Sequence, residues 1–147
     1  MDGSAEVAST MMRWYARPGF FVGDIGRAID FYVGRLGFVK KWHEADGKGT
    51  VCQADRNECE IILAQEAQTG SGGLTRPNHT VDPERSAWDA YVWVEDADAL
   101  SAEFTARGVL IARPIRDQPY GCRDFEVEDC NGYRLCFGHD IEGSATG

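Results

Sequence analysis

The chain lacks a long apolar run and has no excess of basic residues. No stretch of roughly 18 or more apolar residues occurs in its 147 residues, so the sequence predicts no membrane-spanning helix. Lys and Arg number 15 against 24 Asp and Glu, which gives a formal net charge of −9. A phosphate-binding surface needs clustered Lys and Arg, so this balance argues against nucleic acid as a partner and favours cationic or neutral ligands. The alternative is that the acidity serves solubility alone.

Cysteine and histidine do not occur in the patterns that bind zinc or form a disulfide framework. The five cysteines are odd in number and include no C-x-x-C pair. Residues 1–10 are polar and acidic, without the basic and apolar regions of a signal peptide. We therefore expect reduced thiols in a cytoplasmic protein. The three histidines (His43, His79 and His139) share no ligand-pair spacing.

One pattern occurs twice along the chain. Val22-Gly23-Asp24 opens a helical run, and Val94-Glu95-Asp96 opens a second one 72 residues later. Each run ends at a glycine, Gly37 in the first copy and Gly108 in the second. A repeat of this period indicates two copies of one supersecondary unit. Two copies that bury a common core must face each other, so we expect a ligand groove between them.

Each copy is expected to hold one strand, one helix and three further strands. The first helix runs from an N-cap at Asp24 to Gly37, and the second from Asp96 or Asp98 to Arg107. The predicted strands span residues 12–22, 38–44, 50–54 and 59–65, then 88–94, 109–115, 123–128 and 133–138. This order, βαβββ twice, predicts an α+β fold with an open, cleft-bearing sheet.

We expect a single domain over residues 12–141, long enough for one sizeable core. Its parts are module one (12–66), a linker (67–87) and module two (88–141), with a disordered leader (1–11) and a disordered tail (142–147) outside it. The stretch from 66 to 85 is rich in Gly, Thr, Pro and Asn and has no periodicity. It is either a linker between the modules or a flexible flap over the groove.

Several stretches over residues 12–139 carry a resemblance to a known family. They read VGDIGRAIDFY (22–32), LGF (36–38), EIIL (60–63), YVWVED (91–96) and FEVEDCNGY (125–133). Together with the topology they resemble the vicinal-oxygen-chelate superfamily, which includes glyoxalase I, bleomycin-resistance proteins and extradiol dioxygenases. The stretch PYGCRDF (119–125) is most similar to the bleomycin-resistance type. The resemblance implies the glyoxalase/bleomycin-resistance fold, but the reaction less strongly, because this fold hosts enzymes and binders alike.

Strand alternation separates the expected groove wall from the core. In residues 89–94 the small apolar side chains take one face, which leaves Asp89, Tyr91 and Trp93 on the other. A carboxylate and two aromatics with polar groups suit a ligand cleft better than a core. The alternative is that both aromatics are ordinary boundary residues. The same reasoning gives these candidate ligand-binding residues: Arg17, Phe21, Trp42, Glu60, Asp89, Tyr91, Trp93, Phe125 and Cys136.

The resemblance also implies where a metal would be held. The four ligand positions of metal-using relatives correspond to Arg17, approximately Glu60, Asp89 and Cys136. An arginine has no lone pair to donate, and only Glu60 and Asp89 suit a hard divalent ion. We therefore expect no metal, no other cofactor and no catalytic residue. A nucleophilic role for Cys136 stays open as an alternative.

The function expected from these features is metal-free binding. The protein would sequester a cationic or aromatic antibiotic-like ligand, such as one of the bleomycin type, and would act in antibiotic resistance rather than as an enzyme. The resemblance implies a homodimer with clefts across the subunit interface, in which Trp42 either contacts ligand or only seals the seam. One alternative is a metal-dependent glyoxalase- or dioxygenase-like lyase or oxidoreductase, with His43 or His79 in the cleft. Another is a regulatory module that binds a metabolite or peptide.

Overall fold

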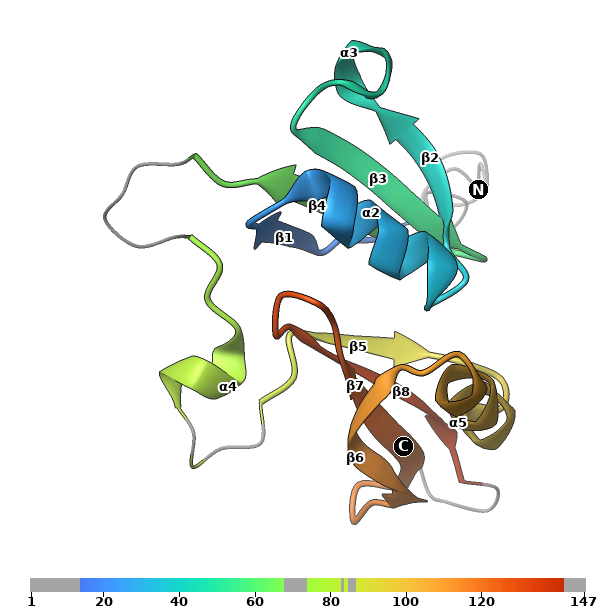
Figure 1. Ribbon diagram of the computed structural model, residues 1–147. Coiled ribbons are helices and arrows are strands. Elements are labelled where there is room, and N and C mark those ends of the chain that lie inside the picture. Colours follow the sequence, from blue (N-terminus) through green and yellow to red (C-terminus); the bar gives the residue numbers. More distant parts are fainter. Residues whose placement is uncertain (1–13, 68–73, 83, 85–86, 142–147) are drawn as a thin grey trace, which may run out of the picture.

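The computed structural model describes residues 14–67, 74–82, 84 and 87–141. The predicted disordered leader (1–11) and tail (142–147) therefore lie outside the described residues. Two modules stack one above the other, and α4 (Asn78–Val81), which comes between them in the sequence, lies to one side (Figure 1). Of the helices that the described ranges contain, none has the length and hydropathy to cross a membrane.

Each module is a four-stranded mixed sheet with one long helix, which confirms the predicted βαβββ repeat and the α+β class. The strand orders are β1-β4-β3-β2 and β5-β8-β7-β6, with β1 parallel to β4 and β5 parallel to β8. Both sheets are open. Module one comprises β1 (Gly19–Val22), α2 (Ile25–Gly34), β2 (Val39–His43), α3 (Glu44–Gly47), β3 (Val51–Arg56) and β4 (Cys59–Gln65). Module two comprises β5 (Ala90–Trp93), α5 (Ala97–Ala106), β6 (Leu110–Asp117), β7 (Cys122–Glu128) and β8 (Arg134–Asp140).

The prediction of a strand over residues 12–22 is wrong at its N-terminal end. The chain is not in a strand from 14 to 18, and β1 begins at Gly19. Pro18 has no N–H to donate to a ladder, although its carbonyl accepts a hydrogen bond from the Ile62 N–H at 2.9 Å. Two short helices were not predicted: α3 follows β2, and α4 (Asn78–Val81) lies within the predicted linker.

The helix ends follow the predicted chemistry. The Asp24 side chain accepts from the Arg27 N–H at 2.9 Å, and the Asp96 side chain accepts from the Ala99 N–H at 3.0 Å. Both aspartates therefore cap their helices. After each helix the chain turns at a glycine with φ near the left-handed region, +74° at Gly37 and +76° at Gly108.

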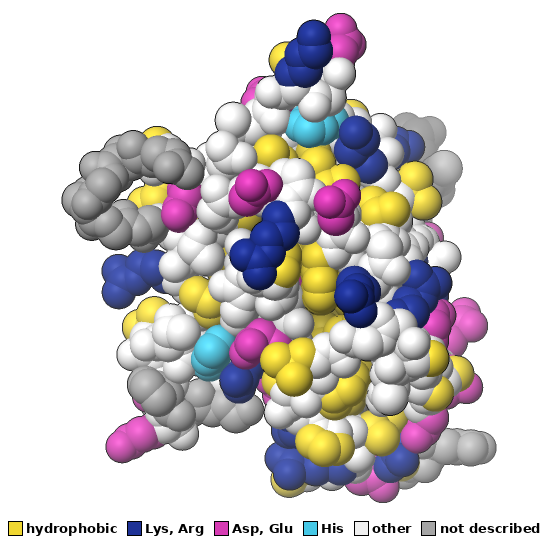
Figure 2. Space-filling model, viewed as in Figure 1, with side chains coloured by type: hydrophobic (Ala, Val, Ile, Leu, Met, Phe, Trp, Pro, Cys, Tyr) yellow, Lys and Arg dark blue, Asp and Glu magenta, His cyan; other side chains and the backbone are white. Residues whose placement is uncertain are grey.

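The two modules meet through contacts that repeat the sequence symmetry. Arg35 and Arg107 are 72 positions apart, and each follows the last residue of its helix. Arg35 Nη1 donates to the Arg107 carbonyl at 2.7 Å, while Arg107 Nη1 donates to the Gly34 carbonyl at 3.3 Å. Such reciprocal contacts indicate an approximate two-fold axis between the helix ends. Figure 2 shows Lys and Arg side chains over α2 and near this junction, with hydrophobic side chains below it on module two.

One continuous core joins the modules. Alternate strand residues point into it: Phe20, Val22, Ile61, Leu63, Leu135 and Phe137, all at most 6% exposed. Phe20 stacks on Tyr133 across the junction with ring centroids 4.5 Å apart. The buried Tyr32 hydroxyl donates to Asp129 Oδ2 at 2.7 Å, which ties α2 of module one to the end of β7.

Candidate functional site

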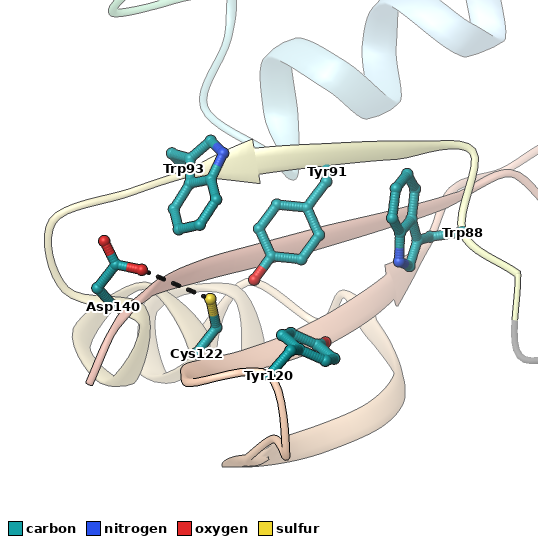
Figure 3. A pocket seen from close by; sticks show the side chains of 6 residues that line it. All are labelled: Trp88, Tyr91, Trp93, Tyr120, Cys122 and Asp140. Atoms are coloured by element: carbon teal, nitrogen blue, oxygen red, sulfur yellow. Dashed lines mark hydrogen bonds between the residues drawn. The ribbon is translucent and has the colours of Figure 1, made fainter. Parts of the chain in front are cut away.

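A cavity of about 530 Å³ lies on the face of module two that points away from α5. Four segments supply its wall: the residues before β5, β5 itself, the turn into β7, and the end of β8 (Figure 3). The lining side chains are Trp88, Tyr91, Trp93, Tyr120, Cys122 and Asp140. We call this cavity the aromatic pocket.

Strand alternation brings three of the rings together. Tyr91 and Trp93 are two residues apart in β5, so their side chains project from the same face of the sheet. The ring centroids of Trp88 and Tyr91 are 5.5 Å apart, and those of Tyr91 and Trp93 are 5.2 Å apart. Trp88, Trp93 and Tyr120 are 41%, 61% and 56% exposed. Large apolar rings gathered at one exposed place are typical of a binding site.

A buried carboxylate fixes the two tyrosines of the aromatic pocket. The Tyr91 and Tyr120 hydroxyls both donate to Asp124 Oδ2, at 2.9 and 2.5 Å. The other oxygen, Oδ1, accepts from Gln118 Nε2 at 3.0 Å and from Arg113 Nη2 at 2.5 Å. Asp124 is completely buried, so these four donors replace the water it gives up.

The same arginine neutralises a second carboxylate behind the aromatic pocket. Arg113 Nε donates to Glu126 Oε2 at 2.8 Å, and Glu126 is 2% exposed. Glu126 Oε1 is buried and has no hydrogen-bond partner among the described residues. One guanidinium therefore pairs with two buried carboxyl groups, Asp124 and Glu126.

Burial and these hydrogen bonds determine which groups at the aromatic pocket are protonated. Burial, and then the hydrogen bond to Asp124, raise the pKa of the Tyr91 and Tyr120 hydroxyls, so both remain neutral donors. Burial opposes ionisation of Asp124, but the hydrogen bonds from the two tyrosines and Arg113 outweigh it and lower the pKa of this carboxyl. Burial also raises the pKa of the Cys122 thiol. The aromatic pocket thus offers rings, a thiol and carboxylates, without an activated nucleophile.

A larger open cavity of about 1030 Å³ lies between the modules. It is bounded by β5, α5 and the start of β4, and it includes Tyr91 and Trp93 from the aromatic pocket. Glu60 from module one also lines it. Tyr91 and Trp93 of β5 therefore border both cavities.

The structure brings only part of the predicted ligand-binding set together. Tyr91 and Trp93 line the aromatic pocket. Glu60 is in the larger cavity and accepts a hydrogen bond from the guanidinium of Arg17 in a partly exposed ion pair. Asp89 lies outside both cavities, because its oxygens accept from the Asn78 and Arg134 backbone N–H groups at 2.9 and 2.8 Å.

Four further candidates lie elsewhere. Phe125 is fully buried against Phe104 and Phe137, so its ring belongs to the core and does not line the aromatic pocket. Cys136 is also fully buried, with its sulfur 3.6 Å from Arg113 Nη2. Phe21 and Trp42 are 47% and 42% exposed on module one, outside both cavities.

Sequence reasoning missed Trp88, Tyr120, Cys122 and Asp140 as lining residues. Trp88 falls within the predicted strand 88–94, where alternation puts it on the face of Ala90 and Val92, but in the structure it precedes β5. Asp140 ends β8 two residues beyond the predicted strand, so alternation was not applied to it. Tyr120 lies in the stretch PYGCRDF, which pointed to a bleomycin-resistance type but not to a contact. Its ring reaches the aromatic pocket because Gly121 turns the chain at φ +85°.

The residues at the implied metal positions do not fit a divalent ion. Arg17 and Glu60 pair with each other, and both Asp89 oxygens accept backbone hydrogen bonds. Burial raises the pKa of Cys136, which opposes the thiolate that a metal needs. Over the described ranges, no three His, Cys, Asp or Glu side chains gather in a way that would hold a metal.

The fold and site define a two-module α+β protein with an aromatic cavity on one sheet. The sequence profile described as the Glyoxalase/Bleomycin resistance protein/Dioxygenase superfamily matches residues 14–137. The chain belongs to this superfamily. No curated protein sequence matches it.

Solved structures share the fold at low sequence identity. TioX from Micromonospora sp. ML1 is 22% identical with a TM-score of 0.65, covering 90% of this chain and 100% of its own. The bleomycin-binding protein from bleomycin-producing Streptomyces verticillus, complexed with copper(II)-bleomycin, is 22% identical with a TM-score of 0.59, covering 89% and 98%. TnmS3, an antibiotic binding protein from Streptomyces sp. CB03234, is 21% identical with a TM-score of 0.62, covering 88% and 98%.

Proposed function

We propose that this protein binds and sequesters an antibiotic-like small molecule, cationic or aromatic, without a metal and without catalysis. The observation that carries the proposal is the aromatic pocket, in which exposed rings surround a cavity and two of them are fixed by Asp124. Fixed rings bind with little loss of side-chain entropy. Sequestration requires no reacting group, and the thiol of Cys122 is held in its neutral form.

Family membership and two of the structural neighbours support the proposal that the protein binds a small molecule. One neighbour is named as a bleomycin-binding protein and another as an antibiotic binding protein. At 22% and 21% identity, these neighbours show only that the fold is shared. The ligand of this chain is therefore proposed from its own pocket and is not taken from theirs. From the predicted set, we propose Tyr91 and Trp93 as the direct ligand contacts.

The proposal includes a homodimer in the cytoplasm. Phe21 and Trp42 leave apolar surface exposed on module one, and a second copy would cover such surface. All five cysteines are free of disulfides, which suits a reducing compartment. Light scattering of the purified protein should give twice the mass of one chain, and a monomer at micromolar concentration would contradict this part.

Calorimetric titration with bleomycin-type antibiotics tests the function. The protein is first treated with a chelator, so that any binding is independent of bound metal. We expect saturable binding that Trp93→Ala weakens by about tenfold or more, since a buried aromatic anchor contributes about 2 kcal/mol. Trp14→Ala is the matched control, because Trp14 is 91% exposed and outside both cavities.

Metal analysis and an activity screen separate this proposal from the enzymatic alternative. The purified protein is assayed for bound metal and for turnover of thiol adducts of 2-oxoaldehydes. Stoichiometric metal together with turnover would reject sequestration. Saturable antibiotic binding without turnover supports it.

A further inference from the structure

We propose that the aromatic pocket selects an alkylated ammonium group, held against the rings of Trp88, Tyr91, Trp93 and Tyr120 with the Asp140 carboxylate as its counter-ion. This inference rests on the proposed function, because it assigns a chemical class to the ligand of the same site. It narrows that function from a cationic or aromatic guest to a weakly hydrated organic cation.

The ring geometry suits a rounded group better than a flat one. The planes of Trp88 and Tyr91 are inclined at 68°, and those of Tyr91 and Trp93 at 52°. A slot for a planar heterocycle needs parallel faces, whereas inclined rings form a cup around a compact group. Figure 3 shows the three rings in a row along β5, with Tyr120 and Cys122 opposite them. Aromatic cups of this kind bind quaternary ammonium groups through their negative ring faces.

The hydroxyl contacts increase the negative charge on the two tyrosine rings. Tyr91 and Tyr120 both donate to the ionised Asp124, which draws each phenol proton toward the carboxylate. Electron density on the phenol ring rises in consequence, and the attraction for a cation rises with it. A neutral guest would gain nothing from this polarisation.

The charges around the aromatic pocket also favour a cation. Arg113 pairs with both Asp124 and Glu126, so two carboxyl groups share one guanidinium behind the rings. Asp140 adds a third carboxylate, exposed at the rim beside Trp93. Within the described ranges its hydrogen-bond donor is the weak Cys122 thiol at 3.7 Å, and no Lys, Arg or His forms an ion pair with it. The carboxylate of Asp140 is therefore available to a cationic ligand.

Hydration decides which cation fits. A primary ammonium is a strongly hydrated point charge with three donors that need acceptors. Four of the six side chains that line the aromatic pocket are aromatic, and its two tyrosine hydroxyls already donate to Asp124. An alkylated ammonium group has no such donors to satisfy and is stripped of water at lower cost. The site should therefore prefer it.

The test compares choline with 3,3-dimethylbutan-1-ol, its neutral carbon isostere, by calorimetry and tryptophan fluorescence on the full chain. We expect choline to bind at least tenfold more tightly than the isostere. Absence of detectable choline binding, or equal affinity for the two, would overturn the proposal.

Two variants place the binding at this site. Asp140→Asn should weaken choline several-fold and leave the isostere unchanged, with Asp46→Asn, an exposed aspartate of module one, as the matched control. Trp93→Leu should weaken choline at least fivefold, with Trp14→Leu as its control. Choline binding that both pocket variants leave unchanged would contradict the assignment. Each altered side chain is exposed, so these variants should fold.

Failure of the cation inference and failure of the proposed antibiotic binding give different results. Choline selectivity without any antibiotic binding would keep the cation site and remove the antibiotic as its guest. Antibiotic binding that Trp93→Leu weakens, with no preference for choline over its isostere, would keep the function and overturn the cation inference.

Discussion

Replacing Asp124 by asparagine should destabilise the protein by about 3–6 kcal/mol. Each carboxylate oxygen accepts from two donors: Oδ2 from Tyr91 and Tyr120, and Oδ1 from Gln118 and Arg113. An asparagine keeps its one oxygen for Gln118 and Arg113 and turns its NH₂ group toward the two tyrosine hydroxyls, which then no longer have a carboxylate to accept their protons. Two hydrogen bonds to a charged group are lost, each contributing about 1.5–3 kcal/mol. The cost of breaking a buried ion pair, about 3–5 kcal/mol, lies in the same range.

The assay is urea unfolding of the wild-type protein and of Asp124→Asn, repeated across acid pH. Because the folded-state pKa of Asp124 lies below its unfolded value, its contribution is complete above the unfolded pKa of about 4. That contribution is lost as pH falls through the folded pKa, so the two proteins should converge in stability in acid. Asp98→Asn, which removes an exposed ion pair with Arg123, serves as a control and should cost at most about 1 kcal/mol. A loss below about 1 kcal/mol for Asp124→Asn, with no convergence in acid, would refute the reasoning.

Three further substitutions test the fold and the site. Gly138→Ala should cost about 1–3 kcal/mol in thermal unfolding and shift Trp93 fluorescence, because the added Cβ would collide with the Tyr91 hydroxyl; an unchanged melting temperature would contradict the tight contact. Tyr32→Phe should cost about 1–3 kcal/mol in urea unfolding, since it leaves the buried Asp129 carboxylate without this donor, and a neutral effect would show that water replaces the hydroxyl. Arg17→Ala should change stability by less than about 1 kcal/mol, because its ion pair is partly exposed, and a loss of several kcal/mol would reveal a larger structural role.

Much of the fold follows from local signals in the sequence. The caps at Asp24 and Asp96 act within their own first turns, so the local sequence locates the first helix start and narrows the second to Asp96 or Asp98, of which Asp96 is the cap. The repeat predicts that the two copies face each other, and the ends of their helices do meet, where Arg35 donates to the Arg107 carbonyl and Arg107 to the Gly34 carbonyl. The start of β1 was misjudged because residues 14–18 are apolar enough to extend a strand, yet they have no ladder partner beyond the Pro18 carbonyl.

The site was only partly predictable from the sequence. Alternation along a strand tells on which face of the sheet a side chain lies, but not what covers that face. Tyr91 and Trp93 were placed correctly on the open face by alternation, and they line the aromatic pocket. Cys136 shares that face, yet the guanidinium of Arg113 lies against it and closes it off. The role of Asp124 depends on four donors from four positions in the chain, and no local pattern predicts such a convergence.

The most direct test of metal-free binding is a crystal structure of the chelator-treated protein with a bleomycin-type antibiotic. We expect ligand density against Tyr91, Trp93 and Tyr120, and a positively charged group beside Asp140. Density instead for a divalent ion coordinated by three or more protein side chains, or a guest bound away from these rings, would contradict the proposed function.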